Sequence, residues 1–210
     1  MKLSIRKKLN IGFLLIGMIL ILALGFTSSQ LFFIGGNVEE AFDVHVANLQ
    51  NVNDIQKELN AQGLYARAYI LDPSEFNLNK LNESSQALVT SIALLPDDAA
   101  KEIKNTIASM KENLKTLNDY ATQIPAFMSN QESHLAMTLV SSDYREVSTF
   151  ISELADNIAN YENSILEKKV KDTNSLISSS FIVAVSWIFV TIIIIVIFLI
   201  YIKRGVTVPL

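Results

Sequence analysis

Two long stretches without a charged residue constrain this chain more than any other feature of its sequence. Residues 11–34 and 181–202 contain no Asp, Glu, Lys or Arg. Each stretch is long enough to cross a hydrocarbon core of about 30 Å as a helix of about 20 residues. A helix satisfies its own backbone N–H and C=O groups in lipid. We therefore predict two transmembrane helices over these two ranges.

The distribution of charge predicts how the chain is oriented in a membrane. Basic residues lie just outside the two apolar stretches, at Lys2, Arg6, Lys7, Lys8, Lys203 and Arg204. The segment between the stretches, residues 35–180, has 11 basic and 21 acidic residues, a formal charge of −10. Lys and Arg concentrate on the cytoplasmic side of membrane helices. We expect residues 1–10 and 203–210 in the cytoplasm and residues 35–180 outside the cell membrane. The acidic surface argues against nucleic acid as a partner.

A cleaved signal peptide is the alternative interpretation of the first apolar stretch. A basic start, an apolar run to Phe26 and the small residues Ala23 and Gly25 all fit such a peptide. The apolar character resumes at residues 31–34 after the polar residues 27–30. This continuation favours an uncleaved membrane span.

The segment between the spans has the spacing of amphipathic helices throughout. Apolar residues recur alternately three and four positions apart, as they do on one face of a helix. The first helix is expected to place Val38, Phe42 and His45 on its core face. We predict four helices, over about 35–71, over about 74–95, from near 96–98 to a turn at 129–130, and from Asn130 or Gln131 into the second span.

Three residues are expected to set the ends of these helices. Ser74 should cap the second helix, because a serine side chain accepts a hydrogen bond from a free backbone N–H. Pro96 should end the second helix. Pro125 should kink or end the third helix, because proline has no backbone N–H to donate.

Sustained spacing of this kind and short connections favour helices that pack at low angles against antiparallel neighbours. The predicted fold is all-α: a membrane-anchored, antiparallel, up-down-up-down four-helix bundle with two transmembrane helices. The two spans continue the first and fourth helices of the bundle. A shift between those two helices would therefore reach the cytoplasmic face of the membrane.

Three short patches add to this layout. They are the basic cluster at 6–8, the sequence ARAYILD at 66–72 and the sequence RGVTVPL at 204–210. With them, the whole chain resembles the sensory module of bacterial chemoreceptors, the methyl-accepting chemotaxis proteins. The last patch is similar to the entry of a HAMP domain. The chain departs from that family by stopping at Leu210, before a complete HAMP domain or a cytoplasmic hairpin.

The resemblance implies a homodimer that binds a small molecule, or an extracytoplasmic binding protein, outside the membrane. It also implies that the receptor modulates a kinase inside the cell. Arg204 and Pro209 would then lie at the junction with the signal-output module. Amino-acid sensors of this family use arginines near the dimer interface, and the stretch 63–71 contains one arginine, Arg67.

Two arginines beside tyrosines are the candidate ligand-binding residues. Arg67 is flanked by Tyr65 and Tyr69, each two positions away, and Arg145 directly follows Tyr144. A guanidinium group suits carboxylate and phosphate ligands. We therefore expect a ligand site formed by Arg67, Tyr69, Tyr144 and Arg145. Solvated or ion-paired arginines are the alternative interpretation.

No catalytic motif can be recognised in the sequence. It has no Gly-rich phosphate loop, no His-Glu-x-x-His helix and no serine nucleophile elbow. Cysteine is absent, so thiol ligands for a metal are absent as well. We expect no enzyme activity, no cofactor and no metal site. His45 is interpreted as a satisfied core histidine, with a ligand-binding or pH-sensing role as the alternative.

The sequence thus predicts the transmembrane sensor region of a chemoreceptor-like signal transducer in the cell membrane. Two alternatives remain open. The same sensor can precede a histidine kinase or a cyclase, or the chain can be a membrane-anchored helical scaffold that binds no ligand.

Overall fold

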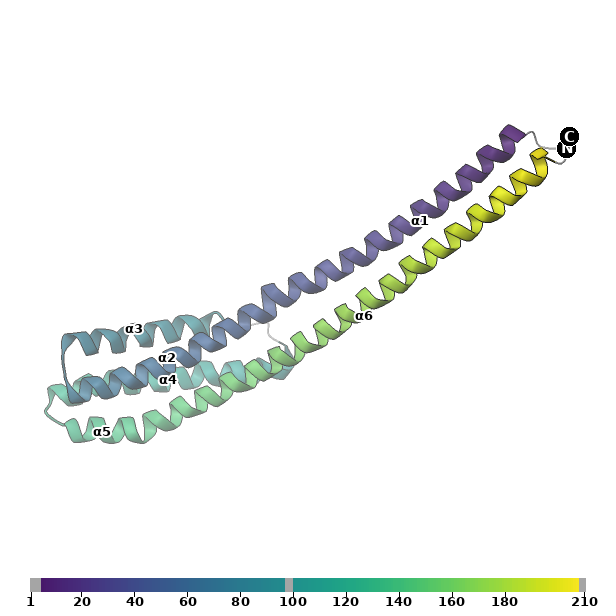
Figure 1. Cartoon of the computed structure of the whole chain (residues 1–210). Coiled ribbons are helices and arrows are strands. Elements are labelled where there is room, and N and C mark those ends of the chain that lie inside the picture. Colours follow the sequence, from purple (N-terminus) through teal and green to yellow (C-terminus); the bar gives the residue numbers. More distant parts are fainter. Residues whose placement is uncertain (1–4, 97–99, 208–210) are drawn as a thin grey trace. The chain divides into compact units, whose positions relative to one another are not determined.

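The computed structural model describes residues 5–96 and 100–207, and every regular element in these ranges is a helix. In chain order the elements are α1 (Ile5–Glu40), the π-helix η1 (Ala41–Val46), α2 (Ala47–Leu71), α3 (Glu75–Ala93), α4 (Lys101–Ser129), α5 (Ser133–Ser141) and α6 (Asp143–Thr207). No residue separates α1, η1 and α2, and only Ser142 separates α5 from α6. The described chain therefore forms four helical segments (Figure 1). The all-α prediction is confirmed.

The chain divides into two compact units. The helix-pair unit consists of Met1–Glu40 and Lys168–Leu210, and the core unit consists of Ala41–Glu167. The first contains α1 and the end of α6. The second contains the other elements and the start of α6.

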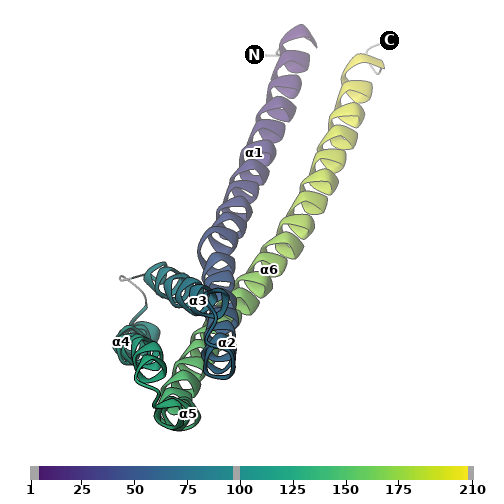
Figure 2. The same ribbon diagram turned by 90° about the vertical axis from the view of Figure 1, so that its left-hand side faces the viewer.

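Within the helix-pair unit, α1 and the end of α6 lie beside each other (Figures 1 and 2) and are joined by three side-chain contacts. The rings of Phe13 and Phe198 meet edge to face, with their centroids 6.2 Å apart. The Ser180 hydroxyl donates to Gln30 Oε1 at 3.4 Å. Further along, Lys169 Nζ lies 2.7 Å from a carboxylate oxygen of Glu40. The order of these contacts shows that the two helices run in opposite directions along each other within this unit.

Both helices of this unit are long and apolar enough to cross a membrane. Their large apolar side chains, from Phe13 on α1 to Ile200 on α6, are mostly exposed. The apolar window of the first segment is 6% buried and that of the second is 0% buried. The apolar side chains therefore lack a protein core to bury them, unlike the core helices of a soluble domain.

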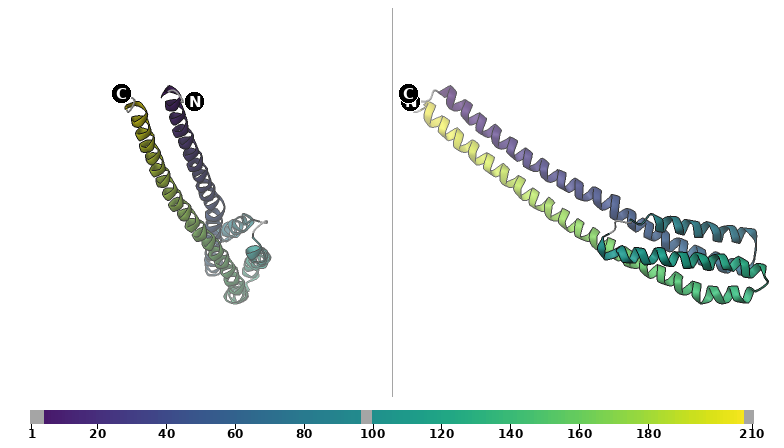
Figure 3. Two further views of the ribbon diagram at one scale, coloured as in Figure 1. Left: turned by 90° about the vertical axis from the view of Figure 1, so that its right-hand side faces the viewer. Right: turned by 180° about the vertical axis from the view of Figure 1, so that it is seen from behind.

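Within the core unit, α4 buries one apolar face with the three-and-four spacing expected of an amphipathic helix. Its buried residues are Ile103, Ile107, Met110, Leu114, Leu117, Ala121 and Ile124. The face of α3 is buried at Leu81, Leu88 and Ile92, and Leu95 follows just after the helix. Figures 1 and 3 show α2, α3 and α4 lying alongside one another in this unit. The regular three-and-four spacing places one apolar stripe of each helix in a shared core.

The buried side chains form two apolar clusters. The larger cluster contains Leu59, Leu88, Leu117 and Ile151, among others, from α2, α3, α4 and α6. The smaller cluster has eight buried members: Ala66, Tyr69, Ile70, Leu81, Ile124, Ala136, Leu139 and Val140. It draws on α2, α3, α4 and α5. Each cluster is therefore built from all four helical segments.

The prediction for the start of the first core face is wrong. Val38 and Phe42 are exposed by 42% and 64% of their surface, and the buried positions begin at Asn48 and Val52. The π-helix η1 contains Phe42 and ends two residues before Asn48. A π-helical turn closes its hydrogen bonds over one more residue than an α-helical turn. Phe42 is consequently out of phase with the buried face that follows η1.

The ends of the other helices largely follow the predictions. The Ser74 side chain caps α3 by accepting from Asn77 N at 3.4 Å, as predicted. Pro125 lies inside α4, which ends one turn later at Ser129. α4 begins at Lys101, after the predicted start at 96–98, of which residues 97–98 lie outside the described residues. The fourth segment begins at Ser133 rather than at 130 or 131, because Gln131 adopts a left-handed φ of 62°.

The break at Ser142 was not predicted. Three hydroxyl groups before and at the break bond back to the helix: Ser141 Oγ to the Met137 carbonyl at 2.8 Å, Ser142 Oγ to the Thr138 carbonyl at 2.7 Å and Thr138 Oγ1 to the His134 carbonyl at 2.8 Å. Such bonds compete with the regular pattern and bend helices. A new helix, α6, then starts at Asp143, whose carboxylate favours a helix N-terminus.

Candidate functional site

A buried polar layer joins all four helical segments of the core unit. Its centre is Gln62 on α2, which is 0% exposed. Gln62 Nε2 donates to Ser85 Oγ on α3 at 2.6 Å and to Asn118 Oδ1 on α4 at 3.4 Å. The Tyr144 hydroxyl on α6 donates to Gln62 Oε1 at 2.9 Å. One amide side chain therefore contacts the three other segments.

This layer lies between the two apolar clusters. Leu59 before Gln62 belongs to the larger cluster and Ala66 after it to the smaller. Tyr144 is itself 1% exposed, and burial raises the pKa of its hydroxyl, while the positive charge of Arg67 acts weakly in the opposite direction. The hydroxyl therefore remains a hydrogen-bond donor at neutral pH.

Two of the four predicted ligand-binding residues meet at Gly63. A Cβ atom placed on Gly63 would lie 3.6 Å from Arg67 Nη1 and 3.7 Å from Tyr144 Cε1. Arg67 Nη1 also donates to the Gly63 carbonyl at 3.1 Å. The side chain of Arg67 thus lies along its own helix, beside the buried ring of Tyr144.

The other two predicted residues lie elsewhere in the core unit. Tyr69 is 8% exposed and belongs to the smaller apolar cluster. Arg145 is exposed on the outer face of α6. The structure therefore brings Arg67 and Tyr144 together, places Tyr69 in the core and leaves Arg145 at the surface. Ligand binding by these four residues stays a prediction.

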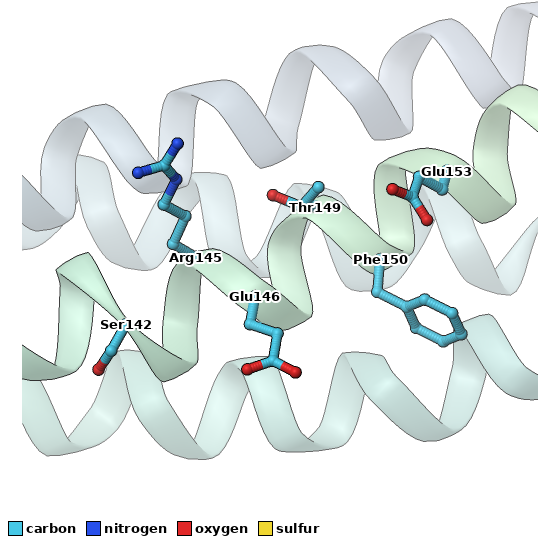
Figure 4. A pocket seen from close by; sticks show the side chains of 6 residues that line it. All are labelled: Ser142, Arg145, Glu146, Thr149, Phe150 and Glu153. Atoms are coloured by element: carbon cyan, nitrogen blue, oxygen red, sulfur yellow. The ribbon is translucent and has the colours of Figure 1, made fainter.

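Arg145 lines a shallow surface depression of about 520 Å³. The other lining residues are Ser142, Glu146, Thr149, Phe150 and Glu153, all from α6 or the residue before it. In the view of Figure 4, Arg145, Thr149 and Glu153 point upward and Ser142, Glu146 and Phe150 point downward along this stretch of the helix. A cation, two carboxylates, two hydroxyls and an aromatic ring are therefore available along one exposed helix face.

No family model, no curated protein and no solved structure matches this chain. Its functional interpretation therefore depends on its own residues and contacts.

Sequence reasoning missed a second buried polar group. Glu162 on α6 is 2% exposed and accepts hydrogen bonds from two residues of the first segment. His45 Nδ1 lies 2.5 Å from Glu162 Oε2, and Asn48 Nδ2 donates to Glu162 Oε1 at 2.8 Å. Glu162 follows the buried Ile158 by four positions and precedes Ile165 by three. This spacing places it on the core face and was the available signal.

Two remaining predictions concern metal ligands and the output junction. Among the residues that the structure describes, no group of three or more His, Cys, Asp or Glu side chains could hold a metal ion. Of the two residues predicted at the output junction, Arg204 belongs to α6 and Pro209 lies outside the described residues. The interior of the core unit thus offers polar side chains that are already hydrogen-bonded, and its surface offers the depression along α6.

Proposed function

We propose that this chain is the transmembrane sensor region of a chemoreceptor-like signal transducer in the cell membrane. In this proposal, α1 and the end of α6 cross the membrane and both termini are cytoplasmic. Residues 35–180 form an extracytoplasmic, antiparallel four-helix bundle. The bundle detects a small molecule or a binding-protein partner, and the spans pass the signal to a cytoplasmic output module.

The observation that carries the proposal is the continuity of α6. This helix contains the buried core residues Ile151 and Ile158 and then the charge-free stretch 181–202, without an interruption. The 65 residues of α6 form one uninterrupted helix. A hydrogen-bonded helix has no loop that would absorb a displacement, so a shift of its core residues is passed along its axis.

The expected displacement is small. Helix shifts at interfaces in switching proteins are about 1–2 Å. A ligand drives such a shift only through its different affinity for the two arrangements, and a tenfold difference is worth about 1.4 kcal/mol. Arg204 and Pro209 lie where the displaced helix would meet the output module.

The depression along α6 supports a ligand site that a second copy of the chain completes. Its lining comes from one helix face, so a bound molecule would be covered on one side only. A homodimer that brings two such faces together would enclose it. Arg145 would pair with a carboxylate or phosphate group of the ligand.

A disulfide between the first and fourth segments tests the signalling mechanism. Gln56 Nε2 and Asp156 Oδ1 are 2.6 Å apart on α2 and α6. The chain has no cysteine, so Gln56→Cys with Asp156→Cys introduces the only two thiols of each chain. In a chimera that joins Leu210 to a characterised kinase-controlling module, oxidation should fix kinase output in one state. The single variant Gln56→Cys, treated with the same oxidant, is the control. Unchanged output after complete cross-linking would refute the mechanism.

A second cross-link tests the homodimer. Thr149→Cys on the depression should give a disulfide-linked dimer in membranes, while Lys115→Cys on the exposed surface of α4 should give much less. Equal yields from the two variants would argue against an α6 interface.

A further inference from the structure

The covered face of the first segment changes phase at the π-helix η1. Counting back by seven from the buried Val52 leads to His45, which contacts Glu162, and then to Val38. Residues seven apart lie on the same face of α-helices that pack at low angles. Val38 is nevertheless 42% exposed, whereas its neighbour Asn37 is half-buried. The covered face of α1 therefore lies one residue earlier than a regular α-helix would place it.

The extra residue lies in η1. A π-helical turn closes its hydrogen bonds over one more residue than an α-helical turn, and such turns are frequent at functional sites. Ala41–Val46 forms one, and the helix continues without a break on both sides. If η1 became α-helical, this residue would join the regular winding. At 3.6 residues per turn and 1.5 Å per residue, α1 would turn by about 100° and move by about 1.5 Å relative to α2.

Contacts with α6 flank η1 on both sides. At its end, Glu162 accepts hydrogen bonds from His45 and from Asn48. Just before it, Lys169 Nζ lies 2.7 Å from a carboxylate oxygen of Glu40, the last residue of α1. The Glu162 side chain is 2% exposed, whereas that of Glu40 is 58% exposed. A solvent-exposed ion pair contributes little to stability, so the contact on the α1 side is the one that breaks more easily.

The α-helical form would have its own favourable contacts. With α1 turned by one residue, Val38 would face α6 in place of Asn37. Covering an apolar side chain instead of a polar amide is favourable. The ion pair between Glu40 and Lys169 would be lost, because Glu40 would turn away from its present position. Each form therefore has a contact that the other lacks, as an element with two discrete arrangements requires.

We propose that η1 is a register switch, which exchanges between its π-helical form and an α-helical form. In the π-helical form Asn37 faces α6, and in the α-helical form Val38 does. The hydrogen bonds to Glu162 hold the α2 side of the switch in place while α1 turns as one piece. The switch rests on the proposed function only for its purpose: in a sensor, a movement of about 1.5 Å has the size of the helix shifts that carry signals.

Cysteine cross-linking of the full chain in lipid nanodiscs tests the switch. Thr173 on α6 is half-buried and lies four residues after Lys169, and Asn37 lies three residues before Glu40, so Thr173 and Asn37 oppose each other. Thr173→Cys is combined with either Asn37→Cys or Val38→Cys, in a chain that has no other cysteine. The rate of disulfide formation reports how often each residue faces Thr173. Asn37→Cys should react fastest.

Gly36→Cys with Thr173→Cys is the matched control. Gly36 and Val38 are the two neighbours of Asn37, turned away from it by about 100° in opposite directions. A Cβ atom placed on Gly36 would meet nothing within 4 Å, so a cysteine fits there. Random rotation of α1 brings both neighbours to Thr173 equally often, whereas the switch brings only Val38. Val38→Cys should therefore cross-link at least tenfold faster than Gly36→Cys.

Deleting Val44 removes the extra residue of η1. Val44 is 46% exposed, so the deletion takes no side chain from the core. The shortened segment can be α-helical throughout with Asn37 still facing α6, and it has no second form. The deletion should slow cross-linking of Val38→Cys to the rate of Gly36→Cys and leave that of Asn37→Cys unchanged.

The switch is overturned if Val38→Cys and Gly36→Cys react equally fast in the undeleted chain. It is equally overturned if their difference persists after Val44 is deleted. Neither measurement needs an output module, so the switch can fail while the cross-linking test of signalling succeeds, and the reverse.

Discussion

The hydroxyl of Tyr144 donates to Gln62 Oε1 across 2.9 Å and so joins α6 to α2 inside the apolar core. Gln62 Nε2 donates in turn to Ser85 Oγ on α3 and to Asn118 Oδ1 on α4. A buried amide has specific requirements for donors and acceptors, so this layer favours one alignment of the four segments over alignments shifted by a turn.

Removing the Tyr144 hydroxyl should destabilise the core unit. Tyr144→Phe leaves Gln62 Oε1 buried without its donor, which costs about 1–3 kcal/mol. Denaturant unfolding of the full chain in detergent, followed by fluorescence or circular dichroism, measures this loss. The control is Tyr65→Phe, which removes a hydroxyl from a half-buried ring on the same helix as Gln62. A loss for Tyr144→Phe no larger than that of the control would contradict the role of the layer.

Alkaline pH should reduce the contribution of Tyr144 to stability. Burial raises the pKa of this hydroxyl above its ordinary value of about 10. Above that pH the unfolded chain releases the proton while the folded chain keeps it, so the free energy of unfolding falls as pH rises, by up to about 1.4 kcal/mol per pH unit for this group. Below about pH 10 the contribution is fully present. The stability difference between the unmodified chain and Tyr144→Phe should shrink at high pH, and a constant difference would exclude the effect.

Two leucines should differ strongly in their effect on stability. Leu117 on α4 is 0% exposed, so Leu117→Ala leaves a cavity and should cost about 2–5 kcal/mol. Leu64 on α2 is 60% exposed, and Leu64→Ala should change the free energy of unfolding by less than about 0.5 kcal/mol. The same unfolding assay compares them. Similar losses from both substitutions would mean that the face bearing Leu64 is also covered in the protein as assayed.

Gln131 offers a stabilising substitution. Its φ of 62° is left-handed, a conformation that costs a side chain with a Cβ about 1–2 kcal/mol and costs glycine little. Part of the gain is lost because glycine is more flexible in the unfolded chain. Gln131→Gly should therefore raise stability by up to about 1 kcal/mol, whereas Gln123→Gly, at an exposed position inside α4, should lower it by about 1 kcal/mol. If both lower stability, the turn at Gln131 is not strained.

The proposed membrane orientation predicts which cysteines can be labelled from outside. Lys80→Cys on α3 should react with a membrane-impermeant maleimide in intact cells, and Lys7→Cys on α1 should react only after the cells are opened. The native chain, which has no cysteine, provides the blank. The opposite pattern of labelling would reverse the orientation. Loss of the N-terminal stretch from the mature protein would instead identify a cleaved signal peptide.

Regular spacing explains what could be predicted from the sequence. On α4 the three-and-four pattern runs from Ile103 to Ile124 without a gap, and all seven positions are buried. Ser74 was recognisable as a cap because its chemistry is local. These features depend on neighbours in the chain, which a sequence displays directly.

The features that escaped prediction depend on contacts between distant residues. Gln62 and Glu162 are polar residues at core-face positions, and their hydrogen-bond partners include Tyr144 and His45, which lie 82 and 117 positions away in the chain. The π-helix cannot be recognised from the local sequence, because Val38, Phe42 and His45 continue the apparent three-and-four spacing of core residues into it. For the same reason Tyr144 was a plausible ligand-binding residue by sequence, although its hydroxyl is already bonded in the core.

The division of the apolar core by Gln62 has a consequence for how the domain opens. The smaller cluster, with eight buried residues, is closed by the short helix α5, and its chain connection to α6 is the irregular Ser142. Local opening is easiest where fewer buried residues pack together, so we expect this end to open more readily than the larger cluster. Substitutions in the smaller cluster would therefore change mainly the free energy of that local opening. This end of the domain can vary in sequence without disturbing the packing around Ile151 and Ile158.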